Sequence, residues 1–179
     1  MKRYLKKILV ALLVVFTFGL TSCAMSRANV YTYWKSSTVE YLGKDHIVEK
    51  INLSKISKKV NKQNEEDTLY VFFGSHDSSS SQAAIRVYNE QAIQYGIEKI
   101  YWVDSSSVSE KDQKKYQEKL GISDLSISPA LYVFKNKTIE FDSSRSYYSG
   151  ANSGKYSPIK LAQIAFKGLY DQNGEYKDK

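Results

Sequence analysis

The sequence has 179 residues, enough for one domain, and it contains a single cysteine. A dithiol redox centre needs two cysteines, so the chain by itself does not carry that chemistry. The formal net charge of +7 is concentrated at the start, because residues 1–22 carry four basic and no acidic side chains. The remainder holds 22 Lys and Arg against 19 Asp and Glu, a balance that gives no reason to expect nucleic-acid binding.

An uncharged run from Ile8 to Leu20 follows the basic start and ends shortly before Cys23. Its thirteen residues are too few to span a bilayer core, which takes about 20, and they favour a secretory signal over a transmembrane helix. The stretch Leu20-Thr21-Ser22-Cys23 resembles the lipobox of bacterial lipoproteins. The resemblance implies diacylglycerol transfer to the Cys23 sulfur and cleavage before it. The protein would then be anchored in the cell membrane, facing outside the cytoplasm.

The predicted organisation is a signal peptide over 1–22, a lipid-anchored tether over 23–38, one domain over 39–171 and a polar tail over 172–179. Within the domain, continuous or alternating apolar runs predict strands, and apolar residues at helical spacing predict helices. In chain order we expect a strand at 47–51, a helix at 53–61, a strand at 68–73, a helix at 79–95, a strand at 99–103, a helix at 109–120, strands at 130–134 and 138–141, and a helix from 157 to about 169.

Capping residues support three of these helix ends. Ser109 with Asp112 predicts an N-cap with its acidic partner, and Ser157 before a proline predicts another helix start. Gly96 fits a C-terminal stop.

Two connections in the second half of the chain are predicted from their length and composition. The link 135–137 between the last two strands is so short that the strands must pair antiparallel. The run 143–157 is expected to be a loop. Its Tyr147 and Tyr148 are interpreted as ordinary surface residues, with a recognition surface as the alternative.

The order of these elements resembles the thioredoxin fold over nearly the whole domain. Two segments carry the resemblance. Tyr70–Gly74 is a buried strand leading through a short turn into a helix, and Ser128–Asn136 is similar to the segment that holds the fold's cis-proline. The implied class is α/β, a thioredoxin-like three-layer α/β/α sandwich with a mixed central sheet. More narrowly, the chain resembles bacteriocin transport accessory proteins of Gram-positive bacteria, in which Phe-Gly and three residues precede Cys-X-X-Cys.

The departure from this family falls on the redox motif. Aligned in this way, the two cysteines correspond to Ser78 and Ser81. A serine hydroxyl cannot form a disulfide, so the resemblance implies the family's geometry without its oxidoreductase activity. Cys23 cannot replace them, because the lipobox assigns its sulfur to a thioether.

The serine run has two interpretations. In the first, Asp77 or Ser78 caps a helix by accepting a free N–H group of its first turn. In the second, the helix start forms one side of a peptide-binding groove, with the cis-proline segment opposite. The candidate groove residues are Ser78, Ser79, Ser80, Ser81, Ser128 and Pro129.

Other chemistry finds little support in the sequence. His76 and Asp77 beside the serines suggest a hydrolase, but adjacent residues do not readily converge into a triad. The two histidines have no second cysteine to complete a zinc site, so we expect neither metal nor cofactor. Lys55, Lys58 and Lys59 share one predicted helix face, which is interpreted as a solvated surface and is also compatible with attraction to an anionic membrane.

The function that fits these observations is a membrane-anchored, redox-inactive binding or accessory protein that handles exported peptides or proteins, such as bacteriocins. One alternative is an enzyme, either a thioredoxin-family oxidoreductase or a protein with an unrecognised site. The other is an envelope structural or adhesion protein in which the fold is only a scaffold.

Overall fold

A computed structural model describes residues 29–35, 41–148 and 157–168. The predicted signal peptide, Cys23 and the polar tail lie outside these residues. Among the described helices, none is both long and apolar enough to cross a membrane.

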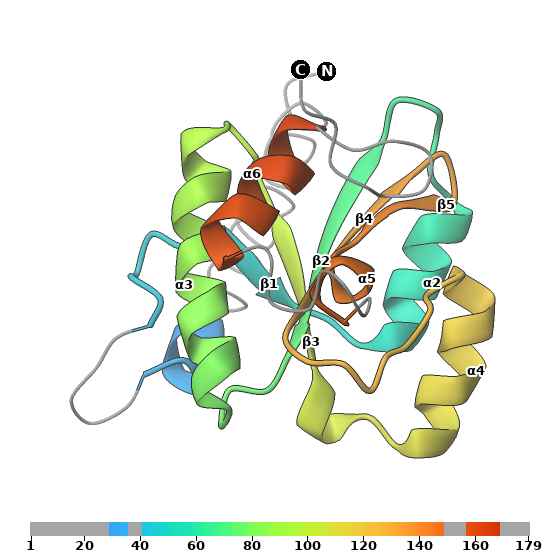
Figure 1. Ribbon diagram of the computed structural model, residues 1–179, viewed down its shortest axis with the longest axis horizontal. Helices are drawn as coiled ribbons and strands as arrows, with labels where there is room; N and C mark the ends of the chain where they lie inside the picture. Colours follow the sequence, from blue (N-terminus) through green and yellow to red (C-terminus); the bar gives the residue numbers. More distant parts are fainter. Residues whose placement is uncertain (1–28, 36–40, 149–156, 169–179) are drawn as a thin grey trace, which may run out of the picture.

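Five strands form one mixed sheet in the order β1-β3-β2-β4-β5 (Figure 1). β1 and β2 run parallel to β3, while β4 runs antiparallel to both β2 and β5. In chain order the elements are β1 (Val48–Lys50), α2 (Leu53–Asn61), β2 (Thr68–Gly74), α3 (Ser79–Gln94), β3 (Ile100–Asp104), the 3₁₀ turn η1 (Ser105–Ser107), α4 (Glu110–Leu120), β4 (Ala130–Lys135), β5 (Thr138–Asp142), α5 (Ser143–Tyr148) and α6 (Pro158–Lys167).

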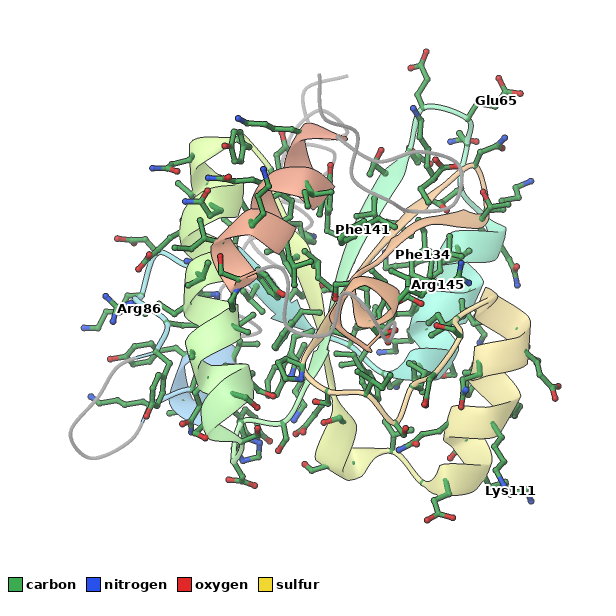
Figure 2. The ribbon with its side chains drawn as sticks, in the orientation of Figure 1. Glu65, Arg86, Lys111, Phe134, Phe141 and Arg145 are labelled. Atoms are coloured by element: carbon green, nitrogen blue, oxygen red, sulfur yellow. The ribbon has the colours of Figure 1, made fainter. Side chains whose placement is uncertain are left out.

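The sheet is covered on both faces, which gives the predicted three layers. α3 and α6 pack against each other on one face, and α2 and α4 cover the other (Figure 1). A hydrophobic core lies on each face of the sheet, and β2 contributes side chains to both because successive side chains point to opposite faces. Phe72 is buried on the α3 side, and Val71 and Phe73 are buried on the α2 side. Figure 2 shows Phe134 and Phe141 inside the molecule, and these two side chains belong to different cores.

The predicted strands and long helices are present, with ends shifted by one or two residues. The hairpin between β4 and β5 turns through Asn136 and Lys137, both with positive φ, as a tight two-residue connection demands. The sequence did not predict α5, which occupies the start of the expected loop. Asp142 Oδ1 accepts a hydrogen bond from Ser144 N at 2.9 Å at the start of this helix. The side chains of Tyr147 and Tyr148 lie outside the described part of the chain.

The folded domain begins earlier than predicted. Residues 29–33 are helical, and Val30 and Trp34 are buried in the core on the α3 side. The predicted organisation has this segment in the tether and the domain beginning at residue 39. That boundary is too late, because large apolar side chains removed from water make residues 29–35 part of the domain.

The burial of Tyr132 on β4 can be tested through the pH dependence of the protein's stability. Burial, with a smaller contribution from the charge of Asp142, raises the pKa of Tyr132 well above its usual 10.0. Above about pH 10 the folded chain therefore keeps the phenol proton of Tyr132, whereas the unfolded chain loses it. The resulting stability is complete below about pH 10 and is lost as pH rises through the folded pKa.

Tyr132→Phe should make the alkaline loss of stability shallower. The difference in slope between the two proteins should approach about 1.4 kcal/mol per pH unit above pH 10. Urea unfolding of both proteins at pH 8 and at several values above pH 10 measures it. Parallel stability curves above pH 10 would contradict the burial of this hydroxyl.

Candidate functional site

Three loops leave the sheet at the same end. Gly74 pairs with Asp104 across the parallel strands β2 and β3, and Phe73 pairs with Ala130 across β2 and β4. Residues 75–81 therefore continue beside residues 105–107 and beside residues 128–129. We call these three segments together the three-loop surface. This is the end of the sheet, at the C-termini of the parallel strands, where α/β proteins commonly place their sites.

One contact joins the strands at the base of the loops, and another joins two of the loops. Trp102 Nε1 donates a hydrogen bond of 2.8 Å to the Gly74 carbonyl. Ser105 Oγ and Ser128 Oγ are 3.3 Å apart and share a hydrogen bond, so η1 lies against the segment of Pro129. The Ser128–Pro129 peptide bond is cis, as the family resemblance implied.

Gly74 is required at the end of β2 by close packing. A Cβ atom at this position would lie 2.5 Å from the Phe72 ring and 3.0 Å from Ser81 Oγ. The backbone can therefore pass between the strand and the first turn of α3 only because no side chain is present.

The serine run caps α3. Ser78 is the N-cap, and its Oγ accepts a hydrogen bond from Ser81 N at 3.4 Å and lies 2.9 Å from Ser80 Oγ. Ser79 and Ser80 are exposed, whereas Ser81 is fully buried, and its hydroxyl has no hydrogen-bond partner among the described residues. Of the two predicted caps, Ser78 rather than Asp77 is the one observed.

The groove between this run and the proline segment remains a prediction. The sheet brings Pro129 beside Gly74, and Ser128 contacts η1 rather than a residue of the run. Ser128 and Pro129 are half-buried. The predicted residues therefore share one end of the sheet, and η1, which the sequence analysis did not include, lies against the Ser128 side.

A charged cluster that the sequence did not predict lies beside the three-loop surface. Asp104 is buried, and its Oδ2 is 3.3 Å from Lys50 Nζ and 3.4 Å from His76 Nδ1. Its Oδ1 accepts a hydrogen bond of 2.7 Å from Ser106 Oγ. The contact with His76 has the distance of an ion pair but not the alignment of a hydrogen bond, since His76 Nδ1 has no hydrogen-bond partner among the described residues. We call Lys50, His76 and Asp104 the Asp104 cluster.

Aromatic rings from two segments cover this cluster. Lys50 Nζ lies 3.8 Å from the centroid of the Tyr33 ring and 4.7 Å from that of Trp102. The Tyr33 ring meets His76 edge-on with centroids 5.3 Å apart. Residues 29–35 thus complete the site as well as the core.

The Asp104 cluster changes the earlier interpretation of His76. In the sequence its only apparent partners are its neighbours, but in the structure the carboxylate of Asp104 at the end of β3 reaches the imidazole. The exposed Asp77 lies on the other side, with Oδ1 3.4 Å from Nε2. Within the described residues no serine hydroxyl is hydrogen-bonded to His76, and Ser75 Oγ instead accepts a hydrogen bond from Asp77 N. The arrangement holds a loop in place and lacks the aligned nucleophile and base of a serine hydrolase.

The sheet order, the strand directions and the two helix layers decide the fold. The chain has a thioredoxin-like fold. No protein-family model matches the sequence, and no curated protein sequence matches it. Among solved structures, the chain is similar to the zinc-bound form of human ERp44, with 17% identity and a TM-score of 0.40. That match covers 68% of this chain and 31% of the ERp44 chain.

The two carboxylates beside His76 should respond differently to removal. Asp104→Ala leaves Lys50, which is partly buried, without its anionic partner, and should lower the free energy of unfolding by about 1–3 kcal/mol. Asp77 has 77% of its side chain exposed, so Asp77→Ala should change stability by less than about 0.5 kcal/mol. Urea unfolding measures both, and equal effects would show that the cluster does not support this thioredoxin-like fold.

Proposed function

We propose that this protein is a lipid-anchored, redox-inactive thioredoxin-like binding module on the outer face of a bacterial membrane. It holds an exported peptide or protein, such as a bacteriocin, at the three-loop surface. One observation carries the proposal: the end of the sheet that holds the redox centre in the thioredoxin family presents serines here instead of thiols.

The chemistry of the three-loop surface suits an extended peptide. Exposed or half-buried hydroxyls come from all three loops, and each is both a donor and an acceptor of hydrogen bonds. A peptide main chain offers the same mixture of donors and acceptors. The first turn of α3 adds N–H groups that favour carbonyl or carboxylate oxygens.

Cross-linking in intact bacteria tests the site. A photoreactive amino acid at Ser79, which is exposed in the first turn of α3, should capture one dominant exported peptide or protein. The matched position is Glu90, which is exposed on the same helix and forms an ion pair with Arg86. If both positions capture the same partners, or if Ser79 captures only cell-wall polymer, the proposed site is wrong and a scaffold role is favoured.

Anchoring rests on the lipobox and has a separate test. Cys23→Ala should reduce incorporation of labelled fatty acid to background, because the acyl chains need its sulfur. Ser22→Ala keeps a small residue before the cysteine and should remain labelled. Normal labelling of the Cys23→Ala protein would refute the anchor without bearing on the three-loop surface.

A further inference from the structure

A stripe of lysines lies on the outward face of α2. Leu53, Ile56 and Val60 turn inward and are buried, so the polar side of the helix faces solvent. Four exposed lysines follow one another along that side, three in the helix and the fourth at its C-cap: Lys55, Lys58, Lys59 and Lys62. Together with Leu69 at the start of β2 they line a groove of about 560 Å³. We call this feature the lysine groove.

The charge of this groove is only partly balanced by the protein. α2 contains no acidic residue. The helix dipole disfavours the cation of Lys55 in the first turn and favours those of Lys58 and Lys59 in the last turn. Among the described residues, no carboxylate pairs with Lys55, Lys58 or Lys62. Asp67 lines the groove, and its Oδ2 accepts a hydrogen bond from Asn64 N at 2.8 Å. Its single negative charge offsets at most one of the four lysines.

A second lysine-rich helix shows that this imbalance is particular to α2. α4 also carries four exposed lysines, but Glu110 and Asp112 occupy its first turn and Glu118 lies between the later ones. Like charges three and four positions apart on a helix repel one another. The α2 stripe therefore lacks, within its own helix, the acidic residues that α4 supplies for itself.

We propose that the lysine groove binds a linear polyanion with repeated phosphate groups. Lysine ammonium groups act as point charges for phosphate, and the groove contains no arginine to clamp a single carboxylate with two parallel hydrogen bonds. The stripe spans two turns of helix, so several phosphates along one chain can be neutralised together.

An extended peptide and a single-stranded nucleic acid fit the groove less well. A peptide that adds a strand needs a free sheet edge, but β2 lies between β3 and β4. Single-stranded nucleic acid needs exposed aromatic rings, and Tyr101, which lies beneath Lys59, is only 8% exposed. The lysine groove lies on the α2 side of the sheet, while residues 29–35 pack on the α3 side.

Titration of the full-length chain in non-ionic detergent with long-chain inorganic polyphosphate tests the proposal. Replacing the four lysines of the groove with Gln should weaken binding about tenfold or more at low salt and reduce the slope of log K against log salt by about 3. The matched control removes the same charge from α4 through Lys111→Gln, Lys114→Gln, Lys115→Gln and Lys119→Gln, and should change affinity less than about threefold. Figure 2 shows Lys111 on the outer side of α4.

Three further measurements make the result decisive: an arginine variant, an acidic peptide and an anionic lipid. Replacing the four groove lysines with Arg keeps the charge, so this variant should bind polyphosphate and provide a folded reference. Equal losses in the α2 and α4 variants would overturn the proposal, because they would indicate a general charge effect. Groove-dependent binding of poly-glutamate as tight as that of polyphosphate, or of micelles doped with phosphatidylglycerol, would also overturn it by assigning the groove to acidic peptides or to lipid headgroups.

Discussion

Trp34→Ala should lower the free energy of unfolding by about 3–5 kcal/mol, the usual loss for a large aromatic side chain removed from a core. Trp34 is 1% exposed. Its ring packs edge-on against Trp102, with centroids 4.8 Å apart, and lies 6.1 Å from Phe72. A cavity at this place would open beneath both β2 and β3, so little of the loss can be recovered by relaxation.

The neighbouring residue provides the control. Tyr33 is 45% exposed, and Tyr33→Ala should destabilise by only about 1 kcal/mol, through its contacts with Lys50 and the nearby rings. Urea unfolding of the soluble chain from residue 24 compares the two variants. If residues 29–35 were a tether, both substitutions would leave stability unchanged.

Ser78→Cys with Ser81→Cys should produce a chain that forms a disulfide between the two positions. Ser78 Oγ already lies 3.4 Å from Ser81 N in the first turn of α3, and a helix N-terminus favours the thiolate needed for exchange. The buried hydroxyl of Ser81 has no hydrogen-bond partner among the described residues, so replacing it with a thiol breaks no hydrogen bond described in the structure. Free thiol in the soluble chain should fall from two per molecule to near zero on mild oxidation.

The matched control for this variant is Ser79→Cys with Ser80→Cys. These residues are exposed in the same helical turn, but adjacent cysteines on a helix do not meet the distance and angle requirements of an ordinary disulfide. The control should therefore keep its free thiols within the monomer. Oxidation of both pairs to the same extent, or of neither, would show that the first turn of α3 lacks the geometry that we infer.

The fold could be predicted because its signals are local. Ser78, Ser109 and Ser157 cap α3, α4 and α6 within a few residues of the helices that they begin. The strands β2 and β3 are continuous apolar runs, and the short hairpin turn leaves no freedom in the pairing of β4 with β5. Each of these elements follows from a stretch of fewer than twenty residues.

The Asp104 cluster could not be predicted in the same way. Lys50, His76 and Asp104 lie far apart in sequence and meet because β3 lies between β1 and β2 in the sheet. The available signal was an acidic residue at the end of a buried parallel strand, where functional groups commonly gather. Without the strand order, nothing indicated which histidine or lysine would reach it.

Two other differences have physical causes that the sequence shows only weakly. Val30 and Trp34 are four positions apart, so their helical spacing is a detectable signal, but one turn is too short to count as periodicity. α5 consists of Ser, Arg and Tyr, and only Arg among these is a strong helix former. Its start is held by the carboxylate of Asp142, a contact that depends on the position of β5.

The central claim is that this thioredoxin-like domain holds its partner without thiol chemistry. Reduction of insulin by the soluble chain, measured beside the Ser78→Cys/Ser81→Cys variant, tests it most directly. We expect the natural sequence to remain at the background set by the reductant alone, and the double variant to rise above that background. Turnover by the natural sequence would contradict the claim, because it would require a redox centre other than the cysteine pair that the chain lacks.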